Sequence, residues 1–401
     1  MDNNSPQNGE YHDHQAGNPP VRSLRELIDR VSGKSFLSTL PQEDLGLAEP
    51  LPYPFLALVG QEEMRLALLL SAINPQIGGV VLIGARGTGK TTAVRSILDL
   101  LPEVERSNCY FGCLPEDIEM NGMDAVCPEC ARKYGQGELL SRMEAVHLVE
   151  LPLNSRIDDV IGGIDERSAL HQRMQLKRGI LANADRNVLY IDEVNLLSND
   201  IVNAILDAAA AGTYTVRRGP ISATYHSRFI LIGSMNPEEG DLRPQIMDRF
   251  GLRVIVKGLD DPAQRLEVYR RVKAFQTNPH GFITQYFSET KAARKEIVRA
   301  RDLLPKVSLP EDVARAGLKV IREMHIDSLR AELALFEASR AYAAADNRTE
   351  VSLNDLQAVG LMTLRLRASS FIKKYISTQT DLEESLRNSF NSDPFSSSSP
   401  G

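Results

Sequence analysis

Short, almost wholly apolar runs recur along the first two thirds of the chain, and turn-forming or charged residues bound each of them. The runs cover residues 78–84, 145–151, 187–193, 227–236 and 252–257. Apolar runs of this length are typical of strands that are buried on both faces. Because helical segments separate them, the pattern predicts an α/β fold with a parallel central sheet over residues 23–258.

The pattern changes after the fifth run, where no strand signal remains and apolar residues recur at helical spacing. Ser308 with Glu311, and Ser352 with Asp355, have the separation of a capping box, which marks the start of a helix. We therefore expect a second, all-α domain over residues 259–370.

Both ends of the chain are polar. Residues 1–22 are rich in Asn, Pro, Gly and His, and they are predicted to form a disordered tail. Residues 371–401 finish in a Ser-rich stretch, so we expect the end of a last helix followed by a second disordered tail.

Charge and hydropathy exclude two classes of partner. The formal net charge of −7 offers no basic face or stripe for nucleic acid. The apolar runs are too short to span a bilayer, and the first residues lack the basic and apolar regions of a secretory signal. We therefore expect a cytoplasmic protein with no nucleic-acid partner and no membrane span.

The segment "GARGTGKTT" has the P-loop pattern G-x-x-x-x-G-K-[ST] and lies between a predicted strand and a predicted helix. Glycines let the backbone N–H groups of such a loop face phosphate oxygens, and the helix N-terminus adds its positive end. Lys90 is expected to bridge the β- and γ-phosphates of ATP, and Thr91 to bind Mg²⁺. The predicted ATP-binding residues are Gly84, Ala85, Arg86, Gly87, Thr88, Gly89, Lys90, Thr91 and Thr92.

A second polar site follows the apolar run "VLYI", which leads into Asp192 and Glu193. At the carboxyl end of a parallel strand these carboxylates face the same edge of the sheet as the P-loop. Asp192 is expected to hold Mg²⁺ through water, and Glu193 to polarise the attacking water. An apolar run that ends in Asp-Glu is common and predicts little by itself. The P-loop upstream is the reason to expect a catalytic role for these two residues.

Two further candidates come from the segment "GSMNPEEGDLRPQIMDRFG". Asn236 ends a predicted strand, where a polar side chain would sense the γ-phosphate. Arg249 precedes the next strand. Offered to the nucleotide of a neighbouring subunit, it would neutralise the charge of phosphoryl transfer, an effect worth roughly 10³–10⁵ in rate. A surface ion pair with Asp248 or Asp241 is the simpler alternative.

Arg330 lies near the start of a helix in the predicted all-α domain. One interpretation is a local ion pair with Asp327 or Glu332. The other is a second sensor, a catalytic arginine that contacts the γ-phosphate of the same subunit's nucleotide. A second sensor would couple hydrolysis to movement between the two domains.

The P-loop, "IDE", Asn236, Arg249 and a helical domain with its own arginine together resemble the AAA+ ATPases. Within this class, "FLALVGQEEMRLALLL", "VLYIDEVNLLSNDIVNAILDAAAAG" and "NPEEGDLRPQIMDRFGLRV" are similar to the ATPase (I) subunits of magnesium chelatase. The resemblance covers residues 50–370, and residues 236–250 are its most specific part.

The resemblance implies a role in chlorophyll or bacteriochlorophyll biosynthesis. It implies that the chain hydrolyses ATP as a homo-oligomeric ring, expected to be a hexamer, joined to a second AAA-like D subunit with an integrin-type domain. The ring would drive a porphyrin-binding H subunit that inserts Mg²⁺ into protoporphyrin IX, so metal insertion is expected outside this chain. The same resemblance implies a β-hairpin at residues 213–226 and a partner-contacting insertion at 152–168.

Three other interpretations stay open. A MoxR-type AAA+ chaperone, or a metal-insertion ATPase of another pathway, would keep most of the site residues, and the segment 236–250 is what favours the chelatase. A nucleic-acid motor would use Arg217 and Arg218 at the hairpin tip, and the acidic pI of about 5.7 argues against it. A scaffold that binds nucleotide without hydrolysis does not fit the intact Lys90 and Glu193.

The four cysteines of the chain are gathered in a predicted insertion, 103–144, which follows the P-loop helix. They form a C-x₃-C pair and a C-x₂-C pair separated by thirteen residues: Cys109 and Cys113, then Cys127 and Cys130. This spacing suits a tetrahedral Cys₄ site, so we predict a structural Zn²⁺ that clamps a long loop beside the ATPase core. A redox-active dithiol and inert thiols are the alternatives, and the family resemblance does not decide among them.

Overall fold

The computed structural model describes residues 51–164, 176–219, 221–240 and 242–367. Both predicted tails, 1–22 and 371–401, lie outside these ranges, as does part of the predicted insertion at 152–168. The described residues from Pro52 onward belong to one compact unit. No helix in this described part is long and apolar enough to cross a membrane.

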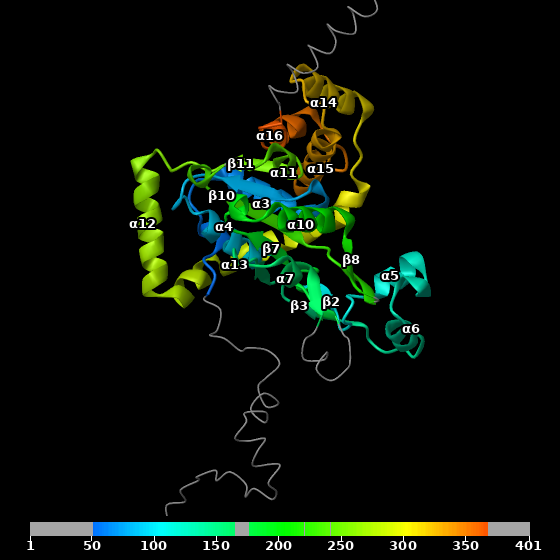
Figure 1. The fold of residues 1–401 in the computed structure, drawn as a ribbon. Coiled ribbons are helices and arrows are strands. Elements are labelled where there is room, and N and C mark those ends of the chain that lie inside the picture. The colour runs from blue at the N-terminus through cyan, green and yellow to red at the C-terminus, as the bar shows by residue number, and fades with distance from the viewer. Residues whose placement is uncertain (1–50, 165–175, 220, 241, 368–401) are drawn as a thin grey trace, which may run out of the picture. The chain divides into compact units, whose positions relative to one another are not determined.

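A five-stranded sheet with all neighbouring strands parallel forms the centre of this unit (Figure 1). The strand order is β11-β1-β10-β7-β4. The strands are β1 (Val80–Ile83), β4 (Leu148–Glu150), β7 (Val188–Ile191), β10 (Ile230–Met235) and β11 (Leu252–Ile255). Each predicted apolar run contains one of these strands, so the predicted α/β fold with a parallel central sheet is confirmed.

Alternate residues of the strands face two different hydrophobic cores, as the pleat of a strand requires. In β1, Val80 and Leu82 belong to one core, and Val81 and Ile83 belong to the other. On the first face lie α3 (Glu62–Ile73), α4 (Lys90–Ile97) and helices of the C-terminal part. On the second face lie α7 (Ile157–Ile161), α9 (Ile180–Asn183), α10 (Asn199–Ala211) and α11 (Pro244–Met247).

The described part after residue 258 is helical, as predicted. It contains α12 (Pro262–Thr277), α13 (Pro279–Leu303), α14 (Glu311–Glu323), α15 (Leu329–Ala345) and α16 (Leu353–Leu364). Ile297, Leu335 and Val359 of these helices share the first core with residues of β1 and α3. The helical part therefore packs on α3 and on the edge strand β11, and it shares the core on this side of the sheet.

The two predicted capping boxes have different outcomes. At the start of α16 the box is present, because the backbone N–H of Ser352 donates to the Asp355 carboxylate at 2.7 Å. At the start of α14 the prediction was wrong, since the helix follows Pro310 without a side-chain cap. Ser308 pairs through its backbone with Thr349 instead, at 2.9 Å, and this pairing holds it outside the helix.

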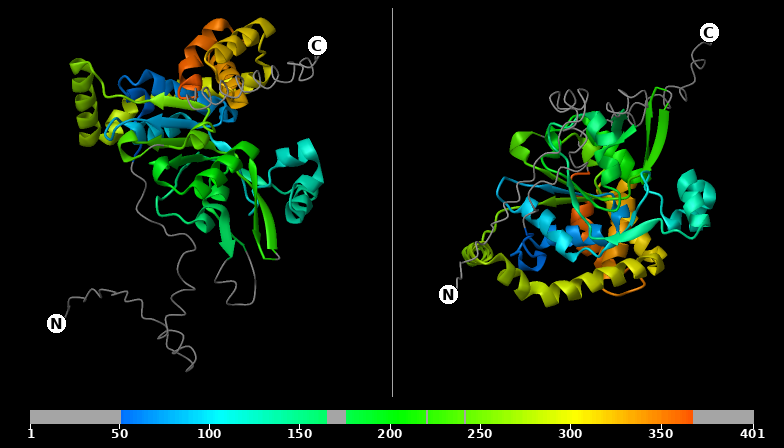
Figure 2. Two further views of the ribbon diagram at one scale, coloured as in Figure 1. Left: turned by 45° about the horizontal axis from the view of Figure 1, so that its top comes forward. Right: turned by 90° about the horizontal axis from the view of Figure 1, so that it is seen from below.

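The cysteine insertion is more than a loop. An antiparallel ribbon of β2 (Val104–Ser107) and β3 (Ser141–Glu144) forms its base, and α5 (Pro115–Asn121) and α6 (Pro128–Gly135) lie between them in the chain. Figures 1 and 2 show the insertion, in cyan, outside the central sheet and beside the β8 strand.

The hairpin predicted at 213–226 is confirmed as β8 (Thr213–Arg218) and β9 (Ile221–His226). A second short ribbon joins β5 (Gly162–Ile164) to β6 (Leu176–Arg178). Short 3₁₀ helices lie at Phe55–Ala57, Pro75–Ile77, Leu98–Leu100, Met123–Ala125, Val194–Leu196, Pro237–Glu239 and Leu304–Lys306.

Candidate nucleotide-binding site

The P-loop runs from the end of β1 to the start of α4, and its glycines serve two different needs. At Gly84 a side-chain Cβ would lie 2.1 Å from the carbonyl oxygen of Val256. Only glycine therefore fits at the point where the loop leaves β1. Gly87 and Gly89 have φ of +77° and +87°, a conformation that glycine adopts without steric cost. Nothing lies within 4 Å of a Cβ built at either of them, so the loop backbone is open for a phosphate group to approach.

Lys90 is the first residue of α4, and its ammonium group folds back over the loop. Nζ donates to the carbonyl oxygens of Gly84 at 2.6 Å and Ala85 at 2.9 Å. Burial lowers the pKa of Lys90, and the carboxylates of Asp192 and Glu193 oppose this shift. A buried amine held only by carbonyl oxygens is ready to exchange them for phosphate oxygens, so the site fits the β- and γ-phosphates that the sequence predicts.

The predicted Mg²⁺ ligands are brought together at the carboxyl edge of the sheet. Tyr190 links them, because its hydroxyl lies 3.1 Å from Thr91 Oγ1 and donates to Asp192 Oδ1 at 2.9 Å. Ser234 Oγ also donates to Asp192. Burial raises the pKa of Tyr190 to about 12, so its hydroxyl keeps its proton. A hydroxyl and a carboxylate placed this close suit Mg²⁺, which prefers oxygen ligands.

Sequence reasoning missed Tyr190 and Ser234. A signal for Tyr190 was present, since residues two apart on a strand point to the same side and Tyr190 precedes Asp192 by two. Ser234 offered no comparable signal, because only the pairing of β10 beside β7 brings its hydroxyl to Asp192.

Glu193 and Asn236 are joined by a chain of polar contacts. Asn236 Nδ2 donates to Glu239 Oε1 at 3.1 Å, and Arg86 pairs with Glu239 at 2.6 Å and with Glu193 at 3.1 Å. The Asn236 hydrogen bond and the Arg86 ion pair lower the pKa of Glu239. Glu193 also has a φ of +52°, which is uncommon for a non-glycine residue. Both the predicted sensor and the predicted catalytic carboxylate are therefore already occupied by protein partners.

Two adjoining cavities surround the P-loop. The first, of about 310 Å³, is lined by Arg86 to Thr92 together with Asp192, Glu193, Ser234, Met235 and Asn236. The second, of about 360 Å³, is largely apolar and is lined in part by Tyr53, Leu58, Met64, Leu259, Val268 and Val272. Both share the glycines of the loop, so a phosphate chain in the first would carry a flat apolar group, such as adenine, into the second. The sequence did not predict the second cavity, because its walls come from distant segments.

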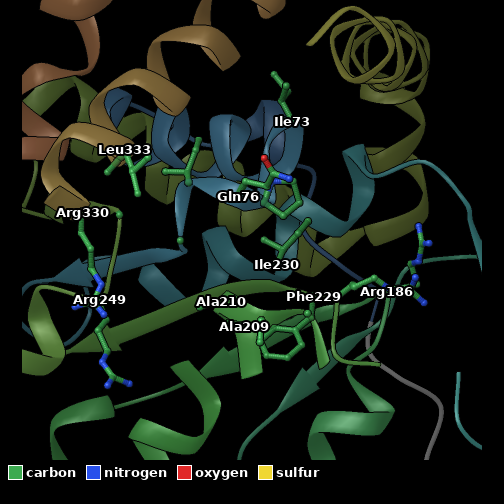
Figure 3. A pocket seen from close by; sticks show the side chains of 18 of the residues that line it. Ile73, Gln76, Arg186, Ala209, Ala210, Phe229, Ile230, Arg249, Arg330 and Leu333 are labelled. Carbon is green, nitrogen blue, oxygen red and sulfur yellow. The ribbon is translucent and has the colours of Figure 1, made fainter. Parts of the chain in front are cut away.

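Arg249 and Arg330 lie elsewhere. They line a cavity of about 740 Å³ that is bounded by the residues preceding β1, β7, β10 and β11, and so lies at the amino edge of the sheet (Figure 3). The P-loop lies at the opposite, carboxyl edge. These four strands have four to six residues at about 3.3 Å per residue, so the two edges are roughly 13–20 Å apart there. This conformation does not bring Arg330 to the γ-phosphate position of its own chain, because the helical part packs over the strand starts.

The amino-edge cavity is strongly basic. Six arginines line it, with Asp248 as the one acidic residue: Arg186, Arg228, Arg249, Arg301, Arg330 and Arg367. Arg249 pairs with the exposed Asp207 at 2.7 Å, and not with the neighbouring Asp248 that the sequence suggested as an alternative. Asp241, the other suggested partner, lies outside the described residues.

Asp248 connects several side chains at this edge of the sheet. Its carboxylate accepts from Arg367 at 2.7 Å, Arg253 at 3.5 Å and Ser328 at 2.8 Å, and it lies 3.6 Å from Arg330. The side chains of Arg253 and Arg367 are 1% and 0% exposed, so Asp248 neutralises two buried guanidinium groups. Arg330 remains more than half exposed, and the local pairs with Asp327 or Glu332 that the sequence suggested are not formed.

The four cysteines converge in the insertion. Their sulfur atoms all lie within 4.8 Å of one another, and the four thiols are free. Cys109 Sγ is 3.7 Å from Cys113 Sγ and 3.6 Å from Cys127 Sγ. The backbone N–H groups of Phe111 and Cys127 donate to the sulfurs of Cys109 and Cys113.

The fold and the site together define an AAA+ ATPase. They combine a P-loop, an Asp-Glu pair and an asparagine at strand ends, and an arginine at the opposite edge of the sheet beside a helical part. Comparison with protein families agrees, because an AAA domain model matches residues 76–236 and an AAA lid domain model matches residues 310–386. A crystal structure of a protein from Cytophaga hutchinsonii shares the fold, with a TM-score of 0.50 and 19% identity, over 82% of this chain and 90% of that chain.

Proteins with similar sequences identify the family within the AAA+ ATPases to which the chain belongs. The "Magnesium-chelatase subunit ChlI homolog" of Methanocaldococcus jannaschii is 44% identical over 80% of this chain and 87% of its own length. The "Magnesium-chelatase subunit ChlI" of Synechocystis is 42% identical over 79% of this chain and 88% of its own length. The chain belongs to the family of magnesium chelatase ATPase subunits.

Proposed function

We propose that this chain is the ATP-hydrolysing motor subunit of a magnesium chelatase. Its ring would drive the insertion of Mg²⁺ into protoporphyrin IX on a separate porphyrin-binding H subunit. The observation that carries the proposal is the shared cavity at the carboxyl edge, where Lys90, Asp192 and Asn236 line one space with the P-loop.

Each residue has a distinct part in hydrolysis. The loop 84–92 binds the phosphates through its N–H groups, and Lys90 exchanges its two carbonyl partners for phosphate oxygens. Thr91 and Asp192 would hold Mg²⁺, which neutralises charge on the phosphates when bound. Glu193 orients the attacking water and polarises it, and Asn236 contacts the γ-phosphate. Both of these last steps require the Glu239 and Arg86 contacts to open first.

The position of Arg249 supports a ring. It lies at the opposite edge from its own P-loop, so it serves a nucleotide only if a neighbouring chain presents that nucleotide to the amino edge. Arg330 lines the same cavity and would act on the same neighbouring nucleotide. We therefore place both catalytic arginines on the subunit next to the bound ATP. A head-to-tail interface of this kind generates a ring when its rotation closes, and a hexamer is the size that the family resemblance implies.

The motor is proposed to work with two other subunits. A D subunit, itself AAA-like with an integrin-type domain, would join the ring, and the H subunit would bind the porphyrin. The exposed hairpin β8–β9 and the segment around α7 are the proposed contact regions on this chain, since both lie outside the central sheet.

We also propose that the four cysteines hold a structural Zn²⁺ in addition to the ATP and Mg²⁺ of the P-loop. Four thiolates at a Zn–S distance of about 2.3 Å in a tetrahedron are about 3.7–3.8 Å apart. The sulfur separations of 3.6 and 3.7 Å around Cys109 agree with this. The insertion also needs such support, because its own hydrophobic cluster contains only four buried residues: Cys113, Ile118, Cys130 and Leu140.

Reconstitution tests the proposed motor activity. The purified chain is mixed with D and H subunits, ATP, Mg²⁺ and protoporphyrin IX, and the fluorescence of Mg-protoporphyrin is followed. We expect a signal that depends on ATP and that disappears with Glu193→Gln. Absence of signal, while the Synechocystis subunit in the same mixture gives one, would contradict the proposal. ATP turnover without any chelation by this chain would favour the MoxR-type alternative.

Metal analysis tests the zinc. We expect one Zn²⁺ per purified chain and its loss in Cys127→Ser. A chain free of zinc after purification and after incubation with Zn²⁺ would leave the dithiol or inert-thiol interpretation.

A further inference from the structure

The residues between the first two cysteines contact the β8–β9 hairpin. The Phe111 ring stacks on Tyr225 with centroids 5.6 Å apart, and Tyr225 stacks in turn on Tyr214 at 5.6 Å. The carbonyl oxygen of Phe111 accepts from the backbone N–H of His226 at 3.3 Å. Tyr225 is only 1% exposed. Phe111, which lies between Cys109 and Cys113 in the chain, completes the small core under the hairpin.

Tyr110 ties the same segment to the neighbouring β5–β6 ribbon. Its hydroxyl donates to the Leu176 carbonyl oxygen at 2.6 Å and accepts from the Arg178 backbone N–H at 2.9 Å. The Arg178 guanidinium lies 5.5 Å from the centre of the Tyr110 ring, within the range of a cation–π contact. The segment 110–112 therefore touches two ribbons at once.

Gly112 lets the backbones approach closely. Its φ is +84°, and a Cβ there would lie 3.3 Å from His226 Cβ and 3.4 Å from Asp185 Oδ2. Its carbonyl oxygen accepts from Arg228 Nη2 at 3.3 Å. The end of the hairpin thus rests on the backbone of the segment between the cysteines.

A mostly buried ionic network continues this contact into α5, which begins two residues after Cys113. Arg228, which follows β9, pairs with Glu116 at 3.2 Å, with Asp117 at 3.1 Å and with Asp185 at 3.4 Å. Asp117 and Asp185 are 8% and 9% exposed, so their charges depend on Arg228 for compensation. Opening the insertion would separate Arg228 from Glu116 and Asp117 and leave it with Asp185 alone.

Neither element is expected to hold its position alone. A two-stranded hairpin is marginal in water by itself, and this one packs on α10 and the β5–β6 ribbon as well as on the segment 110–112. The hydrophobic cluster of the insertion contains only four buried residues. We propose that the metal held by the four cysteines fixes the β8–β9 hairpin, because it fixes the segment 110–112 on which the hairpin rests. This inference depends on the proposed zinc site, and it assigns that site the task of presenting the hairpin to a partner subunit.

Hydrogen exchange on the full-length chain tests the inference. Zinc-loaded protein and protein stripped by a chelator are compared, and zinc per chain is measured on the same samples. We expect the amides of β8 and β9 to exchange at least about tenfold faster without zinc, while β1 and the P-loop helix α4 are unchanged. Equal exchange of the hairpin in zinc-loaded and fully stripped protein overturns the inference, as does a chain that never binds zinc.

Two variants separate the metal from the contact. Phe111→Ala should keep its zinc and still loosen the hairpin, and Cys130→Ser should lose both the zinc and hairpin protection. Met120→Ala, at a side chain on α5 that is 71% exposed, is the matched control and should change neither. Zinc-free Cys130→Ser with an unchanged hairpin contradicts the inference. ATP turnover of zinc-loaded wild-type chain is measured separately, and its loss would count against the motor proposal only.

Discussion

The two edges of the central sheet carry opposite chemistry. At the carboxyl edge, oxygen-rich side chains gather around Lys90, and the glycine loop leaves room for phosphate. At the amino edge, six arginines share one cavity with a single carboxylate. Phosphoryl transfer needs both sets, because one positions the nucleotide and the other neutralises its developing charge. Since roughly 13–20 Å of sheet separates the two sets, we propose that each chain carries halves of two different sites.

The two edges also differ in how strongly ion pairs hold their charged side chains. At the amino edge Asp248 is bound by two fully buried arginines, while Arg249 and Arg330 reach outward. At the carboxyl edge Arg86 is 73% exposed, and its pairs with Glu193 and Glu239 are weak by comparison. We infer that the amino edge is a rigid surface for a neighbour and that the carboxyl edge rearranges when nucleotide binds.

Removal of Arg249, the arginine that we propose one chain offers to the next, should have the strongest effect. Arg249→Ala should lower ATP turnover roughly 10³-fold or more, because the transition-state charge loses its partner. Nucleotide binding should be nearly unchanged, since Arg249 is remote from its own P-loop. Steady-state turnover and binding of a fluorescent ATP analogue measure the two quantities. Arg299→Ala, an exposed arginine of α13, is the control, and turnover of Arg249→Ala close to wild type would contradict the division between the edges.

Next in size is the effect of Asp248 on stability. Asp248→Ala leaves Arg253 and Arg367 buried without a carboxylate, which should lower the free energy of unfolding by about 3–5 kcal/mol. Urea denaturation measures it, with the exposed Asp312→Ala as control. A loss as small as that of the control would show that the amino edge is not held by Asp248.

The same carboxylate predicts a pH dependence. Burial raises the pKa of Asp248, but Ser328, Arg367 and Arg253 together outweigh burial and hold this pKa below its ordinary value. A depressed pKa in the folded state gives stability that is present above the ordinary value of about 3.9 and is lost as the pH falls further. Wild-type protein should therefore lose more stability between about pH 5 and pH 3 than Asp248→Asn, as urea midpoints at each pH would report.

The smallest effect is expected at the carboxyl edge. Glu239→Ala frees Asn236 and Arg86 before nucleotide arrives, and an ion pair to an arginine as exposed as Arg86 is weak. The KM for ATP should fall about two- to fivefold, and kcat should stay within a similar factor. Glu238→Ala, one residue away, is the matched control. A raised KM would mean that Glu239 helps to hold nucleotide instead of competing with it.

The sheet and the P-loop were predictable because both are local in sequence. Each strand is a short apolar run, and the loop pattern lies within nine residues. Asp192, Glu193 and Asn236 could be placed at the same edge because parallel strands share their carboxyl ends. The structure places all three along the P-loop cavity.

The relation between the two domains was not predictable in the same way. The sequence suggested Arg330 as a sensor for its own nucleotide, but packing of Leu335 and Val359 into the core of β1 places α15 over the strand starts. Ser308 was assigned to a helix cap because the motif is local, and a backbone pairing with residue 349, some forty residues away, removed it. Tertiary contacts decided both outcomes, and such contacts cannot be inferred from residue spacing along the chain.

We propose that one chain cannot hydrolyse ATP alone. Turnover per chain is therefore measured across a range of chain concentrations, with nucleotide binding and molecular mass followed in the same samples. We expect dilute monomers to bind nucleotide with almost no turnover, and turnover per chain to rise as the chains assemble. Equal turnover per chain in monomers and assemblies would contradict the account, because it would mean that both halves of the site meet within one chain.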